Sequence, residues 1–414
     1  MEYPRLRPVE AFLVESEGKS FVGMRDPEGV SEATVMMSPA AFFIASMLDG
    51  KNDSLQMKIK FSHSFSGHVL TESEIGEVVK RLDSYGLLDT PTYRLMRADV
   101  RRRFAELRVR PASHAGAAYP GEPDELAAMI KGFFAADGGP GLIVAASPGD
   151  PPRGLVAPHI DFERGGRVYA WAHRRLLDGG LPSLIVILGV AHTAPPEPFA
   201  LTRKAFDTPL GAVETDQDAA DEMAAACGDW VTEDEFAHKL EHSIEFQAVW
   251  LKTMHPQSNA RILPVLCSDF AMFCGDGNPL DDERVSCGLQ ALRRIVTGRG
   301  ALVLASVDFA HVGPQFGDPA AAVDAATGDR VRGCDEDLLR HALVGDADAF
   351  WAAGMKDLNA RHVDALSAVY SLLSILSPVK GEMLSYGQAA APSPAGADGA
   401  AAGGLVSFAA LSFT

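Results

Sequence analysis

Ser183-Leu-Ile-Val-Ile-Leu-Gly-Val-Ala-His192 is an apolar run of strand length that ends in a histidine. Apolar residues at consecutive positions predict a β-strand that is buried on both faces, as in a parallel sheet covered by helices. The run is too short to cross a bilayer, which requires about 20 apolar residues in a helix. It therefore favours a strand of an α/β domain with a histidine at its carboxyl end.

Strand-like and helix-like segments alternate from about residue 111 to the end of the chain. This alternation predicts an α/β fold with a largely parallel or mixed central sheet flanked by helices. The other predicted strands are Gly154–His159, Ala260–Cys267 and Ala301–Phe309, with Phe199–Thr202, Glu382–Gln388 and Leu405–Phe413 at the edges. The predicted helices are Arg167–Leu177, Asp216–Ala226, Glu241–Met254, Glu283–Val296 and His362–Leu376. We expect the Ala/Gly/Pro tract Ala389–Gly404 to form a loop between the last two strands.

The first 110 residues follow a different pattern. Alternation over residues 5–36 predicts two or three strands, and three short helical patterns follow, one opened by the capping box Thr71-Glu-Ser-Glu74. We therefore predict a small α+β, winged-helix-like domain with a linker helix over residues 1–110, and an α/β domain over residues 111–414. The helix ends "LDG" and "YGLLD" resemble those of PqqD-type peptide-binding winged helices.

Charge and composition narrow the possible partners and location. The chain has 37 basic and 55 acidic residues, and its net charge of −18 disfavours a nucleic-acid partner. Its first residues lack the apolar core of a signal peptide, so we expect a cytoplasmic protein that is not attached to a membrane. Five cysteines without a CxxC motif predict neither a disulfide framework nor a structural zinc site.

Histidines and carboxylates follow several predicted strands. Ligands of open α/β sheets bind beyond the carboxyl ends of the strands. The strands end in Ala157-Pro-His159, in His192 and in Asp308-Phe-Ala-His311, while Glu241-His242-Ser243 begins a helix whose N–H groups favour anions. A single histidine after a strand is usually a hydrogen-bonded structural residue. Three at equivalent positions predict one shared functional site.

The residue types suit a metal site. Two imidazoles and a carboxylate bind Fe(II) well and Zn(II) or Mn(II) less specifically, and His159-x-Asp161 resembles one arm of such a site. Asp308 could orient a histidine or serve as a carboxylate ligand. His311 and His242 could transfer protons, because imidazole titrates near neutral pH. The residues alone leave these roles interchangeable.

Seven sequence blocks resemble, in the same order, the signature blocks of the Memo family. They are Ser113-His114-Ala-Gly-Ala-Ala-Tyr119-Pro, Ala157-Pro-His159, Leu188-Gly-Val-Ala-His192, Glu241-His242-Ser243-Ile-Glu245, Asp308-Phe-Ala-His311-Val-Gly313, Arg361-His362 and Tyr386-Gly-Gln. The resemblance covers residues 111–414. It implies a fold like that of the class III extradiol ring-cleavage dioxygenases, with a cleft that holds iron or copper.

The N-terminal extension is similar to that of bacterial family members known as protein B of the AmmeMemoRadiSam system. This resemblance implies a radical SAM protein and an AMMECR-type protein as partners. The family pattern also implies that His159 and His192 are metal ligands and that Asp308 and His311 are a polar pair beside the metal.

The chain departs from the family pattern at two positions. The third metal ligand of well-known members is a cysteine just before a Gly-Arg-His block, and Asn359 stands at that position here. A neutral amide is a harder and weaker ligand than a thiolate, so copper is disfavoured and the chain could be metal-free. Glu241 or Asp161 could substitute as the carboxylate. Gln247 stands where the family often has a histidine.

Two functions are compatible with this pattern, and the sequence leaves open whether the protein is an enzyme. The first is a metal-dependent, dioxygenase-like enzyme for a small-molecule or peptide substrate, with Fe(II) at His159 and His192. Glu241, His242, Asp308 and His311 would then be catalytic. The second is a non-catalytic component of the radical-SAM-linked system that binds a peptide or partner protein and retains a vestigial metal site. DNA binding by the winged helix is disfavoured, because residues 1–110 have no net positive charge.

Overall fold

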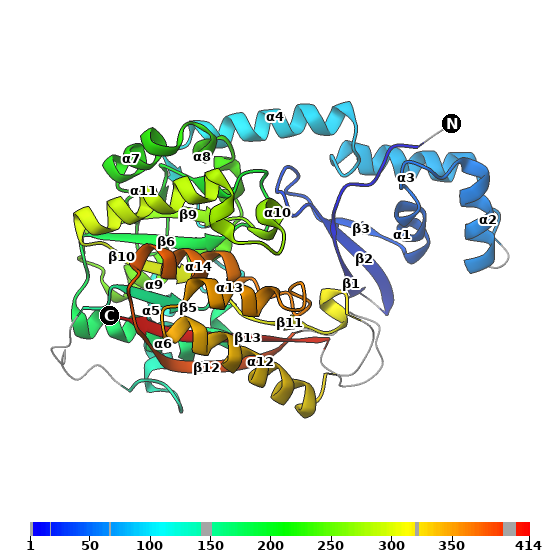
Figure 1. Ribbon diagram of the computed structural model, residues 1–414. Coiled ribbons are helices and arrows are strands. Elements are labelled where there is room, and N and C mark those ends of the chain that lie inside the picture. The colour runs from blue at the N-terminus through cyan, green and yellow to red at the C-terminus, as the bar shows by residue number, and fades with distance from the viewer. Residues whose placement is uncertain (1–2, 17, 66–67, 142–150, 319–322, 392–402) are drawn as a thin grey trace. The chain divides into compact units, whose positions relative to one another are not determined.

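The computed structural model describes residues 3–16, 18–65, 68–141, 151–318, 323–391 and 403–414 (Figure 1). This part of the chain divides into two compact units, one ending at Glu106 and the other beginning at Leu107. Helix α4 (Pro91–Glu106) is the last element of the first unit, and strand β4 (Val109–Arg110) pairs with β8 (Ala205–Phe206) of the second. Of the predicted Ala/Gly/Pro loop, residues 392–402 lie outside the described residues.

The first unit is a three-stranded antiparallel sheet followed by helices. Its strands lie in the order β1 (Glu10–Ser16), β2 (Lys19–Arg25) and β3 (Val35–Met37). Helices α1 (Pro39–Ser46), α2 (Ser54–Ser64) and α3 (Glu72–Ser84) precede α4. Asp53 and Thr71 open α2 and α3 with capping boxes, which satisfy N–H groups that the first helical turn leaves unpaired. The small N-terminal unit is present as predicted, and its likeness to a winged helix stays a prediction.

The second unit is built around a mixed eight-stranded sheet. Its strands lie side by side in the order β11 (His311–Val312), β13 (Gly404–Phe413), β5 (Gly154–Ala157), β10 (Leu302–Ser306), β6 (Leu184–Val190), β9 (Arg261–Cys267) and β7 (Phe199–Leu201), and β12 (Gly381–Ala391) also pairs with β13. The four central strands β5, β10, β6 and β9 are parallel. The outer strands pair antiparallel with their neighbours. The predicted α/β fold with a central sheet is confirmed, and the sheet is mixed.

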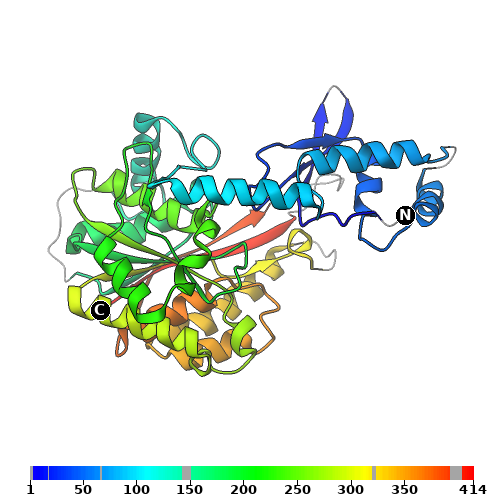
Figure 2. The ribbon, with the colours of Figure 1, turned by 90° about the horizontal axis from the view of Figure 1, so that it is seen from above.

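Side chains of the central strands alternate between two buried layers, so both faces of the sheet are apolar. Val186 and Leu188 pack into one layer, while Ile185 and Ile187 pack into the other. The first layer is covered by α7 (Gln217–Cys227), α11 (Glu283–Arg299), α12 (Ala325–Leu343), α13 (Ala347–Met355) and α14 (Ala365–Leu376). The second is covered by α6 (Phe162–Gly179) and α9 (His242–Met254), against which α5 (Pro123–Ala135) packs. Figure 2 shows helices on both sides of this sheet, which explains the uninterrupted apolar runs.

Short helical segments complete the second unit. They are α8 (Trp230–Glu233), α10 (Ala271–Cys274) and the 3₁₀ turns Glu235–His238, Pro279–Asp281 and Pro314–Phe316. Across the described stretches of the chain, no helix is both long and apolar enough to cross a membrane.

Strand order brings the ends of three central strands together. The chain forms β5, β6, β9 and β10 in that sequence, but β10 lies between β5 and β6 in the sheet. The carboxyl ends of β5, β10 and β6 are therefore neighbours at one edge. Helix α9 begins at the same edge, because the Ser243 hydroxyl in its first turn accepts the N–H of Val190 at the end of β6.

Candidate metal centre

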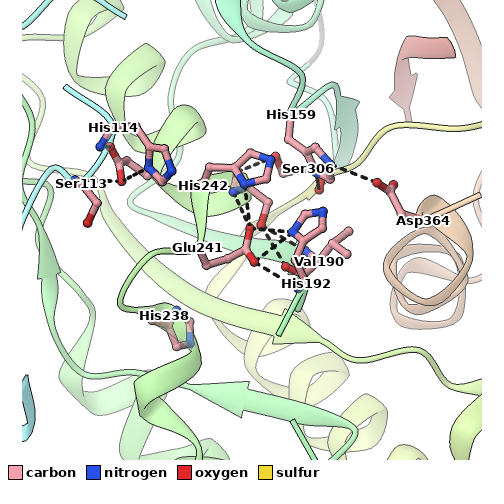
Figure 3. Close-up of polar contacts among 12 residues, drawn as sticks. Ser113, His114, His159, Val190, His192, His238, Glu241, His242, Ser306 and Asp364 are labelled. Atoms are coloured by element: carbon pink, nitrogen blue, oxygen red, sulfur yellow. Dashed lines mark hydrogen bonds and ion pairs between the residues drawn. The ribbon is translucent and has the colours of Figure 1, made fainter. Parts of the chain in front are cut away.

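Three histidine rings meet at this edge of the sheet. His159 follows β5, His192 follows β6, and His242 is the first residue of α9. One ring nitrogen from each histidine lies within 4.8 Å of one from each of the other two. The ring centroids of His192 and His242 are 4.8 Å apart and nearly stacked, and that of His159 lies 5.1 Å from His192 and 5.0 Å from His242 (Figure 3).

The spacing of these nitrogens is compatible with a divalent metal. Three atoms separated by at most 4.8 Å lie within about 2.8 Å of a common centre, whereas metal–imidazole bonds measure about 2.1 Å. An inward shift of about 0.7 Å for each ring, within the range of side-chain rotation, would bring all three nitrogens to bonding distance. The arrangement therefore fits a mononuclear centre.

Glu241 orients two of the three rings. Its side chain caps α9 by accepting the N–H of Ser243 at 2.9 Å, and it also accepts the backbone N–H of His192 at 3.1 Å. Its oxygens lie 3.0 Å from Nδ1 of His192 and 3.4 Å from Nδ1 of His242. A carboxylate beside Nδ1 keeps the proton on that nitrogen and leaves Nε2 free, as in the carboxylate–histidine–metal arrangement of known metal sites.

Ionisation within this group follows from burial and from the Glu241 charge. Burial lowers the pKa of His242 well below its usual value, so this ring is neutral and can accept a metal. Burial alone would lower the pKa of His192 as well, but the Glu241 carboxylate raises it. Burial would raise the pKa of Glu241, yet His192 and His242 hold it well below its usual range, so the carboxylate is charged.

His159 is the most buried of the three rings and is held by the ends of β10 and α14. Its Nδ1 lies 3.1 Å from the carbonyl oxygen of Ser306 and must donate, because a carbonyl only accepts. Its backbone N–H donates to Asp308 Oδ1 at 3.1 Å, and its Nε2 lies 3.0 Å from Asp364 Oδ2. Burial alone would lower the pKa of His159, but the carboxylates of Asp364 and Asp308 raise it to about 10. Without a metal, a proton occupies this Nε2.

His311 lies beside the group, and its two ring nitrogens face different partners. Its Nδ1 lies 3.1 Å from the carbonyl oxygens of Phe309 and His362, so this nitrogen carries the proton. Its Nε2 faces Asp364 Oδ2 at 3.9 Å. His311 is thus placed to exchange a proton with a group bound near His159.

Asn359 is engaged within its own loop. Its amide oxygen accepts the N–H of Val363 at 2.8 Å, and its amide nitrogen donates to the carbonyl of the same residue at 3.0 Å. The loop bends through left-handed φ angles at Leu358 (55°), Asn359 (55°) and His362 (50°). Asparagine tolerates this conformation better than most residues, which accounts for its presence here. A ligand role for Asn359 stays a prediction.

The first signature block supports the start of α9 through Glu245. This buried carboxylate forms an ion pair with the buried guanidinium of Arg110 and accepts the N–H groups of Ser113 and His114. It also accepts the Tyr119 hydroxyl at 2.5 Å. These contacts fix the helix turn that carries His242, and they explain why these two distant blocks occur together.

Gln247, which departs from the family pattern, has structural partners on several elements. Gln247 accepts from His173 Nε2 at 3.1 Å and donates at 2.8 Å both to the carbonyl of Pro158 and to the Ser306 hydroxyl. It therefore braces the backbone on either side of the site.

The last two signature blocks are linked through Asp335, which is buried in α12. Its carboxylate accepts a hydrogen bond from the Tyr386 hydroxyl at 2.8 Å and lies 3.5 Å from Arg361.

The sequence-predicted residues therefore divide into two sets. The structure brings together His159, His192, Glu241, His242, Asp308 and His311. Asp161 lies apart from them, because its carboxylate caps α6 and forms an ion pair with Arg164. Asp364 was missed, since the predicted helix over His362–Leu376 enclosed it, whereas α14 begins at Ala365 and leaves Asp364 at the helix start. An acidic residue directly before an apolar helix was the available signal.

The fold and this site define an α/β protein whose strand ends carry a histidine cluster compatible with a divalent metal. Residues 110–398 match the family of Memo-like proteins, and the chain belongs to that family.

Relatives extend the similarity beyond the second unit. A MEMO1 family protein of Aquifex aeolicus is 28% identical over 381 residues, which cover 91% of this chain and 94% of the relative. MEMO1 family proteins of Methanothermobacter thermautotrophicus (33% over 242 residues, 58% of this chain and 82% of the relative) and Thermus thermophilus (27% over 320 residues, 77% and 89%) are also similar. The family match begins at residue 110, but residues 107–414 are fewer than the 381 residues of the Aquifex aeolicus alignment. That alignment must therefore include part of the N-terminal unit.

Proposed function

We propose that the protein is a metal-dependent, oxygenase-like enzyme with a mononuclear Fe(II) centre at the histidine cluster. The observation that carries this proposal is the approach of three imidazole nitrogens to within 4.8 Å, with Glu241 beside Nδ1 of two of the rings. Histidines with a purely structural role would not need to lie together, because each ring could form its hydrogen bonds with a separate backbone partner.

The donor set favours iron over copper. The grouped ligands are imidazoles with carboxylates beside them, and no cysteine belongs to the group among the described residues. Imidazole and carboxylate suit Fe(II), and less specifically Zn(II) or Mn(II), whereas Cu(I) prefers thiolates. The proposed relationship to the class III extradiol dioxygenases adds a fold-level analogy, which does not by itself define the reaction.

The surrounding residues would bind, orient and protonate a substrate. A divalent metal held here would supply Lewis-acid chemistry and open positions for substrate and O₂ or water. His311 presents Nε2 for proton exchange, and its Nδ1–H is fixed by two carbonyls. Asp308 holds the backbone of His159 through a hydrogen bond. The His192 side chain is 40% exposed, so the site opens to solvent and could admit a small-molecule or peptide ligand.

Metal analysis of anaerobically purified protein tests the proposal. We expect one Fe(II) per chain, its loss in His159→Ala and His192→Ala, and its retention in His255→Ala, which removes a histidine outside the site. O₂ uptake by the iron-loaded protein with catechols and peptides would then identify the substrate class. Absence of stoichiometric metal, together with wild-type behaviour of His159→Ala in every assay, would refute the enzyme proposal.

A second function is favoured by the N-terminal unit: binding of a peptide or partner protein. Strand β1 lies at the edge of its sheet, and most of its residues are exposed. An exposed edge strand can pair with an extended peptide through backbone hydrogen bonds. We infer that this winged-helix-like unit binds a radical SAM protein or an AMMECR-type protein in the cytoplasm, as protein B of an AmmeMemoRadiSam system.

Co-purification with these two proteins, using the full chain and a chain without residues 1–106, tests this second function. Capture by the full chain alone is the expected result. Equal capture by both chains would place the binding surface elsewhere, and capture by neither would count against the proposed system.

A further inference from the structure

Asp364 presents a carboxylate oxygen to the histidine cluster. Its Oδ1 accepts the backbone N–H of Asp308 at 2.9 Å, which fixes the orientation of the side chain. Its Oδ2 is buried and makes no well-aligned hydrogen bond within the described part of the chain. This oxygen lies 3.0 Å from Nε2 of His159 and 3.9 Å from Nε2 of His311, and Figure 3 shows the carboxylate directed at the His159 ring.

The spacing between Asp364 Oδ2 and His159 Nε2 is that of two ligands on one metal. Ligands bonded at about 2.1 Å and at right angles to each other lie about 3.0 Å apart. The observed distance is 3.0 Å. Because Nδ1 of His159 donates to Ser306, Nε2 is the nitrogen that faces Asp364 Oδ2. A proton on Nε2 holds these two atoms together in the metal-free protein, and a metal ion that replaced this proton would be bonded by both.

We propose that Asp364 is the anionic ligand of this metal centre and completes a set with His159 and His192, in place of Asn359. The proposal rests on the metal centre proposed above. The Asn359 amide is already paired on both sides with Val363, whereas Asp364 directs Oδ2 at the His159 ring nitrogen at ligand spacing. A carboxylate in this position would favour Fe(II), Mn(II) or Zn(II) over Cu(I).

Anaerobic Co(II) titration of the full chain and of Asp364→Asn tests the assignment. Asparagine retains Oδ1 for the N–H of Asp308, so the loop is expected to stay folded. Loss of a ligand should weaken Co(II) binding by at least about 100-fold, more than the loss of a residue that only supports a ligand. Asp335→Asn, at a buried carboxylate outside the site, is the matched control and should bind Co(II) like the wild type.

The direction of the change in Co(II) affinity distinguishes a metal ligand from a residue that is only the counter-ion of His159. If Asp364 only stabilised a protonated His159, its removal would ease loss of that proton and strengthen Co(II) binding at neutral pH. Unchanged or tighter binding by Asp364→Asn therefore overturns the proposal. A wild-type chain that binds no Co(II) overturns the metal centre itself, so the two failures are distinguishable.

Cysteine substitution gives a spectroscopic readout that does not depend on affinity. Co(II) bound by Asp364→Cys should show a sulfur-to-cobalt charge-transfer band, because a thiolate would then contact the metal. The same substitution at Asn359 should show no such band. A band with Asn359→Cys and none with Asp364→Cys would assign the third ligand to Asn359 and overturn the proposal.

Discussion

Replacement of Glu241 by glutamine tests how the site is held together. Glu241 is 4% exposed, and each of its two oxygens accepts a backbone N–H, Oε1 from Ser243 and Oε2 from His192. The same oxygens lie beside Nδ1 of His192 and His242. Glutamine keeps one oxygen and replaces the other with an amino group, which cannot accept a hydrogen bond.

The magnitude follows from these contacts. In either orientation of the amide, one buried backbone N–H would face a donor and lose its acceptor, which costs about 1–3 kcal/mol of folding free energy. The rings would also lose the charge that keeps their protons on Nδ1. Loss of such a supporting carboxylate lowers metal affinity about 10- to 100-fold, equivalent to about 1.4–2.7 kcal/mol.

Two measurements on Glu241→Gln and on the matched variant Glu245→Gln separate these effects. Both substitutions neutralise a buried carboxylate at the start of α9, Glu241 at the N-cap and Glu245 in the first turn, and denaturant unfolding should show a stability loss in both. Anaerobic Co(II) titration should show the larger affinity loss in Glu241→Gln, because Glu241 contacts two of the rings directly, whereas Glu245 supports only the helix turn that carries His242. Equal affinities for Glu241→Gln and the wild type would refute the role of Glu241 as the residue that orients the ligand rings.

Three other substitutions test the packing and charges that support the site. A Cβ at Gly189 would lie 2.5 Å from a side-chain oxygen of α9, so Gly189→Ala should lower the free energy of unfolding by about 1–3 kcal/mol, whereas Gly132→Ala, with nothing within 4 Å, should not. Burial lowers the pKa of His173 to about 3, so the folded ring stays neutral while the unfolded ring takes up a proton below about 6.5. The contribution of the neutral His173 ring to the free energy of unfolding is therefore present above that pH and is lost as the pH falls toward 3, by up to about 1.4 kcal/mol per pH unit. Denaturant unfolding at pH 5 and at pH 7 should show a smaller difference in stability for His173→Asn than for the wild type. Arg110→Met leaves the buried Glu245 carboxylate without its cation and should cost about 3–5 kcal/mol by the same assay.

The sheet could be predicted because its signals are local. Apolar runs such as Leu184–Val190 are long enough to identify strands, and β5, β6, β9 and β10 occur where the pattern placed them. Helices α5, α12 and α13 were not predicted, although Pro123 opens α5 and Asp324 caps α12 in the manner of ordinary helix starts. The position of β10 between β5 and β6 is a long-range property that no local pattern encodes.

The candidate site was predictable only in part. Residues at strand ends can be grouped from the sequence because parallel strands share one edge, and this reasoning places His159, His192 and Asp308 together. Asp364 could not be grouped with them, because its position depends on a left-handed turn at His362 that ends the loop before α14. The sequence predicts Asn359 as a weakened ligand, whereas its two hydrogen bonds to Val363 depend on how the loop folds and leave no local sequence signal.

X-ray absorption spectroscopy of the anaerobic, Fe(II)-loaded protein tests the central claim most directly. The strand-end imidazoles and a carboxylate predict one iron per chain, coordinated only by nitrogen and oxygen at about 2.0–2.2 Å, with multiple scattering from at least two imidazole rings. A sulfur shell at about 2.3 Å, or iron without imidazole scattering, would contradict it and show that His159 and His192 do not bind a common metal.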